Sequence, residues 1–240
     1  MSGLADHDSA CLAPDELQRA ARFQFPVHKN RFVASRVWLR SVLAQFTNSS
    51  PTSLQFEQHP LGKPFLVEPK TGLEFNFSRS EMNCICAATQ GCKIGIDIEN
   101  VRPLSDMHAT ALTIFDDADF RAWSTLDNQE QQFAFFRSWT RKEAIAKANG
   151  AGISLGVENI KVPVSKLPLA SFQRTTVDGM SYLFSDLDVE PNIAASVAME
   201  LEPHETFLRY EDLAKQMLKV DTAEPFPETH HFVGEIVLQQ

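Results

Sequence analysis

Two long segments without glycine or proline, residues 28–46 and 129–149, each precede a group of short strand-like runs. Segments of this length and composition predict helices. The first is followed by candidate strands at residues 53–57, 73–77, 82–89 and 93–99, and the second by candidates at 157–164, 180–184 and 193–200. This repeated order predicts an α+β fold of two similar lobes, each with a helix and a small antiparallel sheet.

The break at Arg102-Pro103 is the expected boundary between the two lobes. We therefore predict an N-terminal lobe at residues 1–102, a C-terminal lobe at 103–220 and a tail at 221–240. Further helices are expected at residues 116–126 and 210–218. The tight connection Gln90-Gly91-Cys92 predicts an antiparallel hairpin of the strands on either side of it. A cleft between two such lobes is a common place for a ligand.

The bulk composition excludes several classes of protein. The 240 residues include 22 Lys and Arg and 31 Asp and Glu, which gives a net charge of −9. This acidic excess argues against general binding to nucleic acid or to membrane surfaces. No apolar run approaches the length needed to cross a bilayer, and residues 1–16 lack the pattern of a secretory signal. We therefore expect a cytoplasmic protein. Its four cysteines do not suggest a disulfide framework. Two interpretations remain for Cys84, Cys86 and Cys92: they are buried small side chains, or they form part of a zinc site.

The clearest period-two pattern of the chain is Cys92–Val101, CKIGIDIENV. Ile94, Ile96 and Ile98 share one face of the predicted strand, while Gly95, Asp97 and Glu99 share the other. The two carboxylates then lie about 7 Å apart at Cα, close enough to converge on one Mg²⁺ ion. The alternative is an exposed strand with an acidic face. Gly95 favours the first interpretation, because it leaves room for another backbone or a ligand.

A second charged pattern lies in the helix at residues 129–149. Phe135, Trp139, Glu143 and Lys147 are spaced four apart and fall along one side of it. A surface Glu143–Lys147 pair would be ordinary, but a carboxylate at the edge of an apolar stripe is costly unless a cation compensates it. A metal shared with Asp97 and Glu99 would provide that compensation, and Lys147 would be available for a phosphate.

Together these two elements resemble the signatures of the Sfp-type 4′-phosphopantetheinyl transferases. That family has a G-[IV]-D-[IV]-E strand and, roughly forty residues later, a W-[ST]-x-K-E-[AS]-x-x-K helix, which match Gly95–Glu99 and Trp139–Lys147. Leu61–Pro64 resembles the family's G-K-P turn, and Asn76–Ser80 its N-x-S-H-S segment. The resemblance covers most of the chain up to residue 200. Arg79 stands where the family usually has histidine. The arginine keeps a cation for binding phosphate, but it cannot take a role that needs a titrating imidazole.

The resemblance implies two α+β lobes related by a pseudo-twofold, with coenzyme A in the cleft between them. It implies transfer of 4′-phosphopantetheine from coenzyme A to a serine of an apo acyl- or peptidyl-carrier protein, with release of adenosine 3′,5′-bisphosphate. Asp97, Glu99 and Glu143 would hold Mg²⁺. Glu143 would also take the serine proton, directly or through a metal-bound water, and Lys147 would stabilise the leaving α-phosphate. The resemblance also implies a monomer.

The remaining basic residues suggest where the coenzyme phosphates bind. Between Leu17 and Phe56 the chain has no acidic residue but six basic ones: Arg19, Arg22, Lys29, Arg31, Arg36 and Arg40. The segregation suggests an anion site, although a solvated helix face is the alternative for each residue taken singly. By family position, Arg19 and Arg31 are expected at the 3′-phosphate, and Lys63, Ser78, Arg79, Asp97 and Lys147 at the diphosphate. Glu16 falls near a position that is often basic in the family, so that site is expected to be built differently here.

Two other functions compete with transfer. A binding protein with the same fold would be expected to lack one of Asp97, Glu99, Glu143 or Lys147, and all four are present. A different Mg²⁺-dependent phosphotransferase would be expected to carry a glycine-rich phosphate loop, and the sequence has none.

Overall fold

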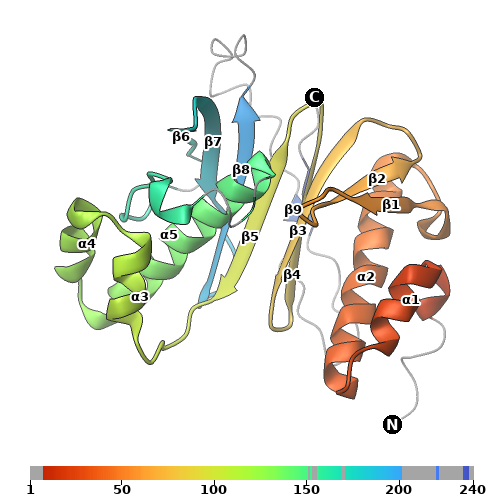
Figure 1. Ribbon diagram of the computed structural model, residues 1–240, viewed down its shortest axis with the longest axis horizontal. Coiled ribbons are helices and arrows are strands. Elements are labelled where there is room, and N and C mark those ends of the chain that lie inside the picture. Colours follow the sequence, from red (N-terminus) through yellow and green to blue (C-terminus); the bar gives the residue numbers. More distant parts are fainter. Residues whose placement is uncertain are drawn as a thin grey trace. The chain divides into compact units, whose positions relative to one another are not determined.

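The computed structural model describes residues 8–150, 152, 156–168, 171–201, 220–221 and 235–237. The chain forms two compact units, Met1–Leu73 and Glu74–Gln240. Each unit contains helices and an antiparallel sheet (Figure 1), so the predicted α+β class is confirmed. The predicted lobe boundary between residues 102 and 103 lies inside the second unit.

The first unit is built from two helices and a hairpin. Its elements are η1 (Asp8–Cys11), α1 (Pro14–Ala21), α2 (Pro26–Thr47), η2 (Pro51–Ser53), β1 (Gln55–Gln58) and β2 (Pro64–Glu68). The predicted helix at 28–46 is α2, which begins at a proline and ends at Asn48 in the left-handed conformation. β1 and β2 pair antiparallel. Neither α1 nor β2 was expected, because both are short.

The second unit contains the long helix α5 and two four-stranded sheets. Its elements are β3 (Leu73–Ser80), β4 (Asn83–Gln90), β5 (Ile94–Asn100), α3 (Met107–Ile114), α4 (Asp117–Ser124), α5 (Asn128–Asn149), η4 (Val157–Asn159), β6 (Gln173–Val177), β7 (Met180–Asp186), β8 (Ile193–Leu201), β9 (Val220–Asp221) and β10 (Glu235–Val237). One sheet has the order β3-β4-β10-β9 and the other β5-β8-β7-β6. In Figure 1, α5 crosses the second sheet, and it packs against β5, β8 and β7.

Two predictions about strands were wrong, and one prediction about a helix lies outside the described residues. β4 and β5 do not form the expected hairpin, because β5 hydrogen-bonds β8 and so belongs to the other sheet. The strand expected at 157–164 is instead the 3₁₀ turn η4 followed by irregular chain. The helix expected at 210–218 falls outside the described residues. Of the tail, Asp221 ends β9, and β10 pairs in parallel with β4.

The alternation of β5 sorts its side chains between two layers, as the sequence predicted. Ile94, Ile96 and Ile98 are fully buried in an apolar cluster with residues of β4 and β8. Gly95 faces α5 so closely that an added Cβ would lie 2.0 Å from the Ala144 carbonyl oxygen and 2.4 Å from the Ala148 nitrogen. Only glycine permits this approach, so Gly95 brings the helix backbone directly onto the strand.

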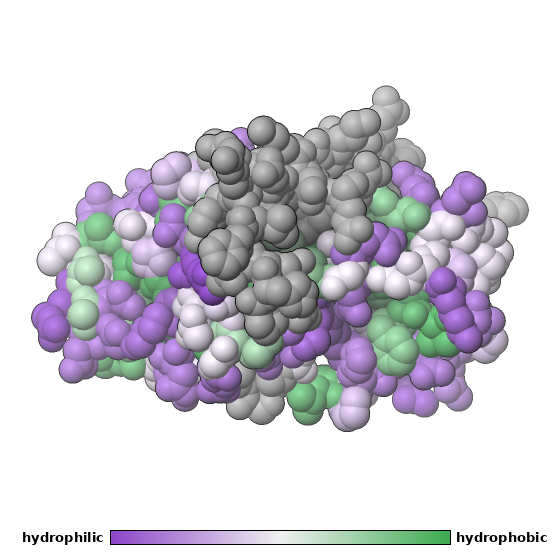
Figure 2. Space-filling model, turned by 90° about the horizontal axis from the view of Figure 1, so that it is seen from above, coloured by the Kyte–Doolittle hydropathy of each residue, from purple (hydrophilic) through white to green (hydrophobic). Residues whose placement is uncertain are grey.

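The described surface is mixed in character. Figure 2 shows hydrophilic and apolar residues interspersed on the visible face. The large apolar side chains that are exposed are Leu17, Phe25, Val27, Leu61 and Leu112. Within the described ranges, no helix is both long and apolar enough to cross a membrane.

Candidate active site

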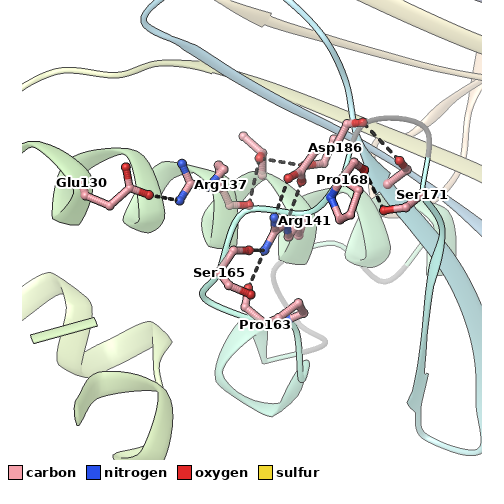
Figure 3. Close-up of polar contacts among 11 residues, drawn as sticks. Glu130, Arg137, Arg141, Pro163, Ser165, Pro168, Ser171 and Asp186 are labelled. Atoms are coloured by element: carbon pink, nitrogen blue, oxygen red, sulfur yellow. Dashed lines mark hydrogen bonds and ion pairs between the residues drawn. The ribbon is translucent and has the colours of Figure 1, made fainter. Parts of the chain in front are cut away.

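The C-terminal part of α5 carries the two site residues predicted on a helix, and charged neighbours fix how this helix is turned. Arg141 is fully buried and grips Asp186 with two hydrogen bonds, from Nε to Oδ1 (2.7 Å) and from Nη2 to Oδ2 (2.5 Å). It also donates to the carbonyl oxygens of Pro163 and Ser165 (Figure 3). Such a bidentate, satisfied pair tolerates burial and specifies orientation.

Lys142 anchors a second side of α5. Its buried ammonium donates to the carbonyl oxygens of Ile114 and Val157, the latter at 3.0 Å. Burial lowers the pKa of Lys142 to about 8, although Asp119, Asp116 and Glu158 oppose that shift. With Arg141 and Lys142 turned to these partners, Glu143 and Lys147 are left on the side of the helix that meets β5.

Lys147 and Asp97 form the centre of the site. Lys147 Nζ lies 2.5 Å from Asp97 Oδ1 and also donates to Ser78 Oγ (3.1 Å) and to the Ile96 carbonyl oxygen (3.2 Å). Ser78 Oγ donates to the same Asp97 oxygen at 2.8 Å. Asp97 is only 4% exposed. The structure therefore brings together three predicted site residues, from β3, β5 and α5.

Each candidate metal-binding carboxylate has an oxygen that accepts no hydrogen bond from the described residues. Asp97 Oδ2 and Glu143 Oε1 are buried and have no hydrogen-bond partner among the described residues. Glu99 accepts from Ser80 (2.8 Å) and from Arg102 (3.5 Å), in both cases at Oε2. Buried polar atoms are normally satisfied, so two unpaired carboxylate oxygens indicate a missing partner.

Electrostatics at Glu143 agree with this placement. Burial raises the pKa of Glu143, Lys147 lowers it, and the nearby charges of Asp97 and Glu99 raise it again, so that the pKa lies above its usual value. The charges of Asp97 and Glu99 therefore lie near enough to Glu143 to affect its pKa. They are nevertheless not drawn into a tight ligand set: within the described residues, no group of three or more His, Cys, Asp or Glu side chains is arranged to hold a metal ion.

Unpaired carboxylate oxygens of this kind fit Mg²⁺, which takes oxygen ligands. The donor set is oxygen-only and acidic, and its cationic neighbours among the described residues include Lys147 at Asp97 and Arg102 at Glu99. None of the cysteines considered for zinc, Cys84, Cys86 and Cys92, forms a disulfide with another described cysteine.

Alternation along β3 separates two residues that the sequence placed together. Asn76, Ser78 and Ser80 are buried and all reach β5: Asn76 Oδ1 accepts from the Ile96 nitrogen at 2.9 Å, and the two serines bond the carboxylates. Arg79, one residue on from Ser78, is exposed. It lies near Cys84, whose pKa burial raises to about 12 while Arg79 opposes the rise. Asn76 and Ser80 lie in the segment that resembles the family's N-x-S-H-S pattern, but neither was given a role from the sequence, and Arg102 was not anticipated.

The basic residues of the first unit divide into structural and accessible ones. Glu16 is buried and forms ion pairs with Arg36 (2.5 Å) and Arg40 (2.7 Å), and Arg40 also donates to the carbonyl oxygens of Pro51 and Leu54. These two arginines stabilise the unit and are not open to an anion. The negative charge of Glu16 is explained by the same contacts.

A cavity of about 540 Å³ lies in the first unit beside α1. Its lining residues are Asp15, Gln18, Arg19, Arg22, Phe23 and Gln58. Arg19 is exposed there and stacks over the Phe32 ring at 5.4 Å. Arg31 is half-buried, with an Nε that has no hydrogen-bond partner among the described residues. Lys63 is half-buried in a turn in which the Gly62 nitrogen donates to His59.

Comparisons with family profiles and with curated proteins point to the same family. A profile of the 4′-phosphopantetheinyl transferase superfamily matches residues 93–198, and one described as 4′-phosphopantetheinyl transferase, N-terminal, matches residues 5–91. The chain is 37% identical to the 4′-phosphopantetheinyl transferase HetI of Nostoc sp. over 80% of this chain and 79% of the relative. It is 25% identical to the 4′-phosphopantetheinyl transferase Sfp of Bacillus subtilis over 84% and 89%. It is 24% identical to the L-aminoadipate-semialdehyde dehydrogenase-phosphopantetheinyl transferase of Xenopus laevis over 66% and 56%.

Proposed function

The chain belongs to the 4′-phosphopantetheinyl transferase family, and on that premise we propose that Asp97, Glu99, Glu143 and Lys147 form its catalytic site. Enzymes of this family transfer 4′-phosphopantetheine from coenzyme A to carrier proteins. The single observation that best supports the assignment is the pair of buried, unpartnered oxygens, Asp97 Oδ2 and Glu143 Oε1, next to Lys147. Leaving such atoms without a partner is costly, so a cation that binds both would repay the cost.

Asp97, Glu99 and Glu143 would hold Mg²⁺, which would neutralise charge on the diphosphate of coenzyme A. Of the residues themselves, Glu143 would act as the general base, and burial raises the pKa of its carboxyl above the usual value. It would take the proton of the carrier serine as the serine oxygen attacks the β-phosphorus. The bond from that phosphorus to the bridging oxygen breaks, and adenosine 3′,5′-bisphosphate leaves.

Lys147 would stabilise the negative charge that grows on the departing α-phosphate. In this structure its ammonium is paired with Asp97 and Ser78, so it already lies beside the carboxylate that would meet the diphosphate. Ser78 would contribute a hydroxyl there. The exposed Arg79 is proposed to contact coenzyme phosphate as a charge that pH does not remove.

In the first unit, Arg19, Arg31 and Lys63 are proposed to bind coenzyme A. Arg19 lines the cavity beside α1 together with Arg22, which gives that cavity two guanidinium groups suited to phosphate. Asp15 lies in the same lining, so the positive charge there is partly offset.

The acceptor is proposed to be a serine of an apo acyl- or peptidyl-carrier protein. Because the enzyme is acidic overall, docking of an acidic carrier requires a local basic or apolar surface. We further propose that the protein acts as a cytoplasmic monomer without nucleic-acid partners.

Metal removal tests the proposed site. Transfer to an apo carrier protein should stop in EDTA and return when Mg²⁺ is added in excess. Asp97→Asn, which keeps the size of the side chain but removes its charge, should require far more Mg²⁺ for half-maximal transfer. Full transfer in EDTA, or an Asp97→Asn variant with an unchanged Mg²⁺ requirement, would contradict the assignment.

A further inference from the structure

We propose that Ser80 is a positioning residue that fixes the carboxylate of Glu99 for metal binding. This inference rests on the metal assignment proposed above and adds a residue to it. Ser80 is the last residue of β3 and is only 8% exposed. Its hydroxyl donates to Glu99 Oε2 at 2.8 Å.

The surroundings of Ser80 leave its hydroxyl a single direction in which to donate. A serine hydroxyl has one proton to give and can accept at its lone pairs. Ser80 Oγ accepts from the Asn100 backbone nitrogen at 3.3 Å, which occupies the accepting side. The proton is therefore directed to Glu99, the neighbour of Asn100 in β5.

Asn100 clamps Ser80 from the other side as well. Its side-chain amide donates to the Ser80 carbonyl oxygen at 3.3 Å, and its own Oδ1 accepts from Asn83 Nδ2 at 3.0 Å. Asn83 begins β4, directly after the turn at Glu81 and Met82. The position of Ser80 is thus set by backbone and amide contacts that do not involve Glu99.

This hydrogen bond decides which oxygen of Glu99 remains available. Both groups that bond Glu99, Ser80 and Arg102, reach Oε2, so Oε1 accepts no hydrogen bond within the described part of the chain. The Arg102 contact is long, at 3.5 Å, and its side chain is 48% exposed, so it holds the carboxylate less firmly. Asp97 shows the same pattern: Ser78 donates a hydrogen bond to Oδ1, and Oδ2 has no hydrogen-bond partner among the described residues.

Residues that orient a metal ligand typically contribute about 10- to 100-fold to metal affinity. Ser80→Ala should therefore weaken binding of Mn²⁺, a paramagnetic substitute for Mg²⁺, by about tenfold or more in the presence of coenzyme A. Ser80→Thr keeps the hydroxyl and should bind nearly as tightly as the wild type. Ser185→Ala is the control, because Ser185 is also buried but donates to the Asp186 carbonyl oxygen.

The experiment is a titration of Mn²⁺ followed by electron paramagnetic resonance, with the melting temperature of each variant as a check on folding. The Mg²⁺ concentration for half-maximal transfer should rise in Ser80→Ala, while the rate at saturating Mg²⁺ largely recovers. If Ser80→Ala does not fold, Ser80→Cys, which keeps a weak donor of similar size, should show the same weakening in smaller measure.

Two outcomes would overturn the proposal in distinguishable ways. If the wild type binds Mn²⁺ and Ser80→Ala binds it equally well, the role of Ser80 is wrong while the metal site stands. If the wild type with coenzyme A binds no Mn²⁺, the metal assignment fails, and the role of Ser80 fails with it.

Discussion

At the residue scale, the candidate site is defined by how its carboxylates share their oxygens. Asp97 offers one oxygen to Lys147 and Ser78 and keeps the other unpaired, and Glu143 also keeps a buried oxygen unpaired. A site with its cations complete would satisfy these atoms. The arrangement therefore agrees with a site that is completed when metal and diphosphate bind.

The sequence predicted which faces these residues lie on, because a strand's period of two and a helix's spacing of four are local properties. Gly95 and Asp97 do face the helix, Lys147 does face the strand, and the charges of Asp97 and Glu99 act on Glu143. The position of Arg79 was less predictable. The sequence grouped it with Ser78, but alternation along β3 places Arg79 on the exposed face and Ser78 on the face that meets β5.

Lys147→Met should lower the rate constant for transfer by about 10²- to 10³-fold, because it removes a cation directed at the leaving phosphate. The measurement is single-turnover transfer at saturating coenzyme A. Lys161→Met is the matched control, since Lys161 pairs with Asp116 on the surface and is 60% exposed. A Lys147→Met variant as fast as this control would exclude Lys147 from the chemistry.

At the element scale, the site depends on the contact between α5 and β5. Gly95 sets their distance, while Arg141 and Lys142 set the rotation of the helix through Asp186 and backbone carbonyl groups. The sequence predicted α5 and its end at Gly150, which has a φ of 86°. It did not predict that consecutive charged residues of one helix would be buried against separate partners, because that requires knowing the neighbouring chain.

Gly95→Ala should force α5 away from β5, because the new methyl group would overlap helix backbone that cannot move alone. We expect a loss of stability of about 1–3 kcal/mol and a loss of transfer larger than the folded fraction explains. Gly179→Ala is the control: its φ of 80° makes the change costly, but no atom lies within 4 Å of the added carbon. Transfer per folded molecule that falls equally in both variants would contradict the role of Gly95.

The buried ion pairs of Glu16 with Arg36 and Arg40 lead to a prediction about the free energy of unfolding. Glu16→Gln leaves Arg40 buried without its charged partner and should lower the free energy of unfolding by about 3 kcal/mol. Glu130→Gln, at a pair with a 44% exposed glutamate, should cost about 1 kcal/mol or less. Urea denaturation of both variants measures the difference.

The effect of Glu16 should also depend on pH. Burial alone would raise the pKa of Glu16, but Arg36, the Ala13 amide and Arg40 lower it, and the net pKa is below its usual 4.5. A group whose pKa is lower in the folded than in the unfolded state stabilises the protein at pH values above its unfolded-state pKa. That contribution is lost as the pH falls through the folded-state pKa. The difference between wild type and Glu16→Gln should therefore shrink in acid below pH 4.5. A difference that stays constant from neutral pH into strong acid would contradict this account.

At the scale of the whole molecule, the α+β class followed from the order of helices and strands, but the pairing of the strands did not. β4 and β5 are adjacent in sequence, yet β5 joins β8, which lies almost a hundred residues later. Local pattern carries no information about such a distant partner. The short elements α1, β2, α3 and β6 were also missed, because few residues in each define a period.

The central claim is that this chain transfers phosphopantetheine with Glu143 in its active site. The most direct measurement is the intact mass of several apo acyl- and peptidyl-carrier proteins after incubation with coenzyme A, Mg²⁺ and enzyme. We predict that the wild type adds one phosphopantetheine group to at least one carrier, and that an equally folded Glu143→Gln variant adds essentially none. No mass gain on any carrier, or near-normal transfer by Glu143→Gln, would contradict the account.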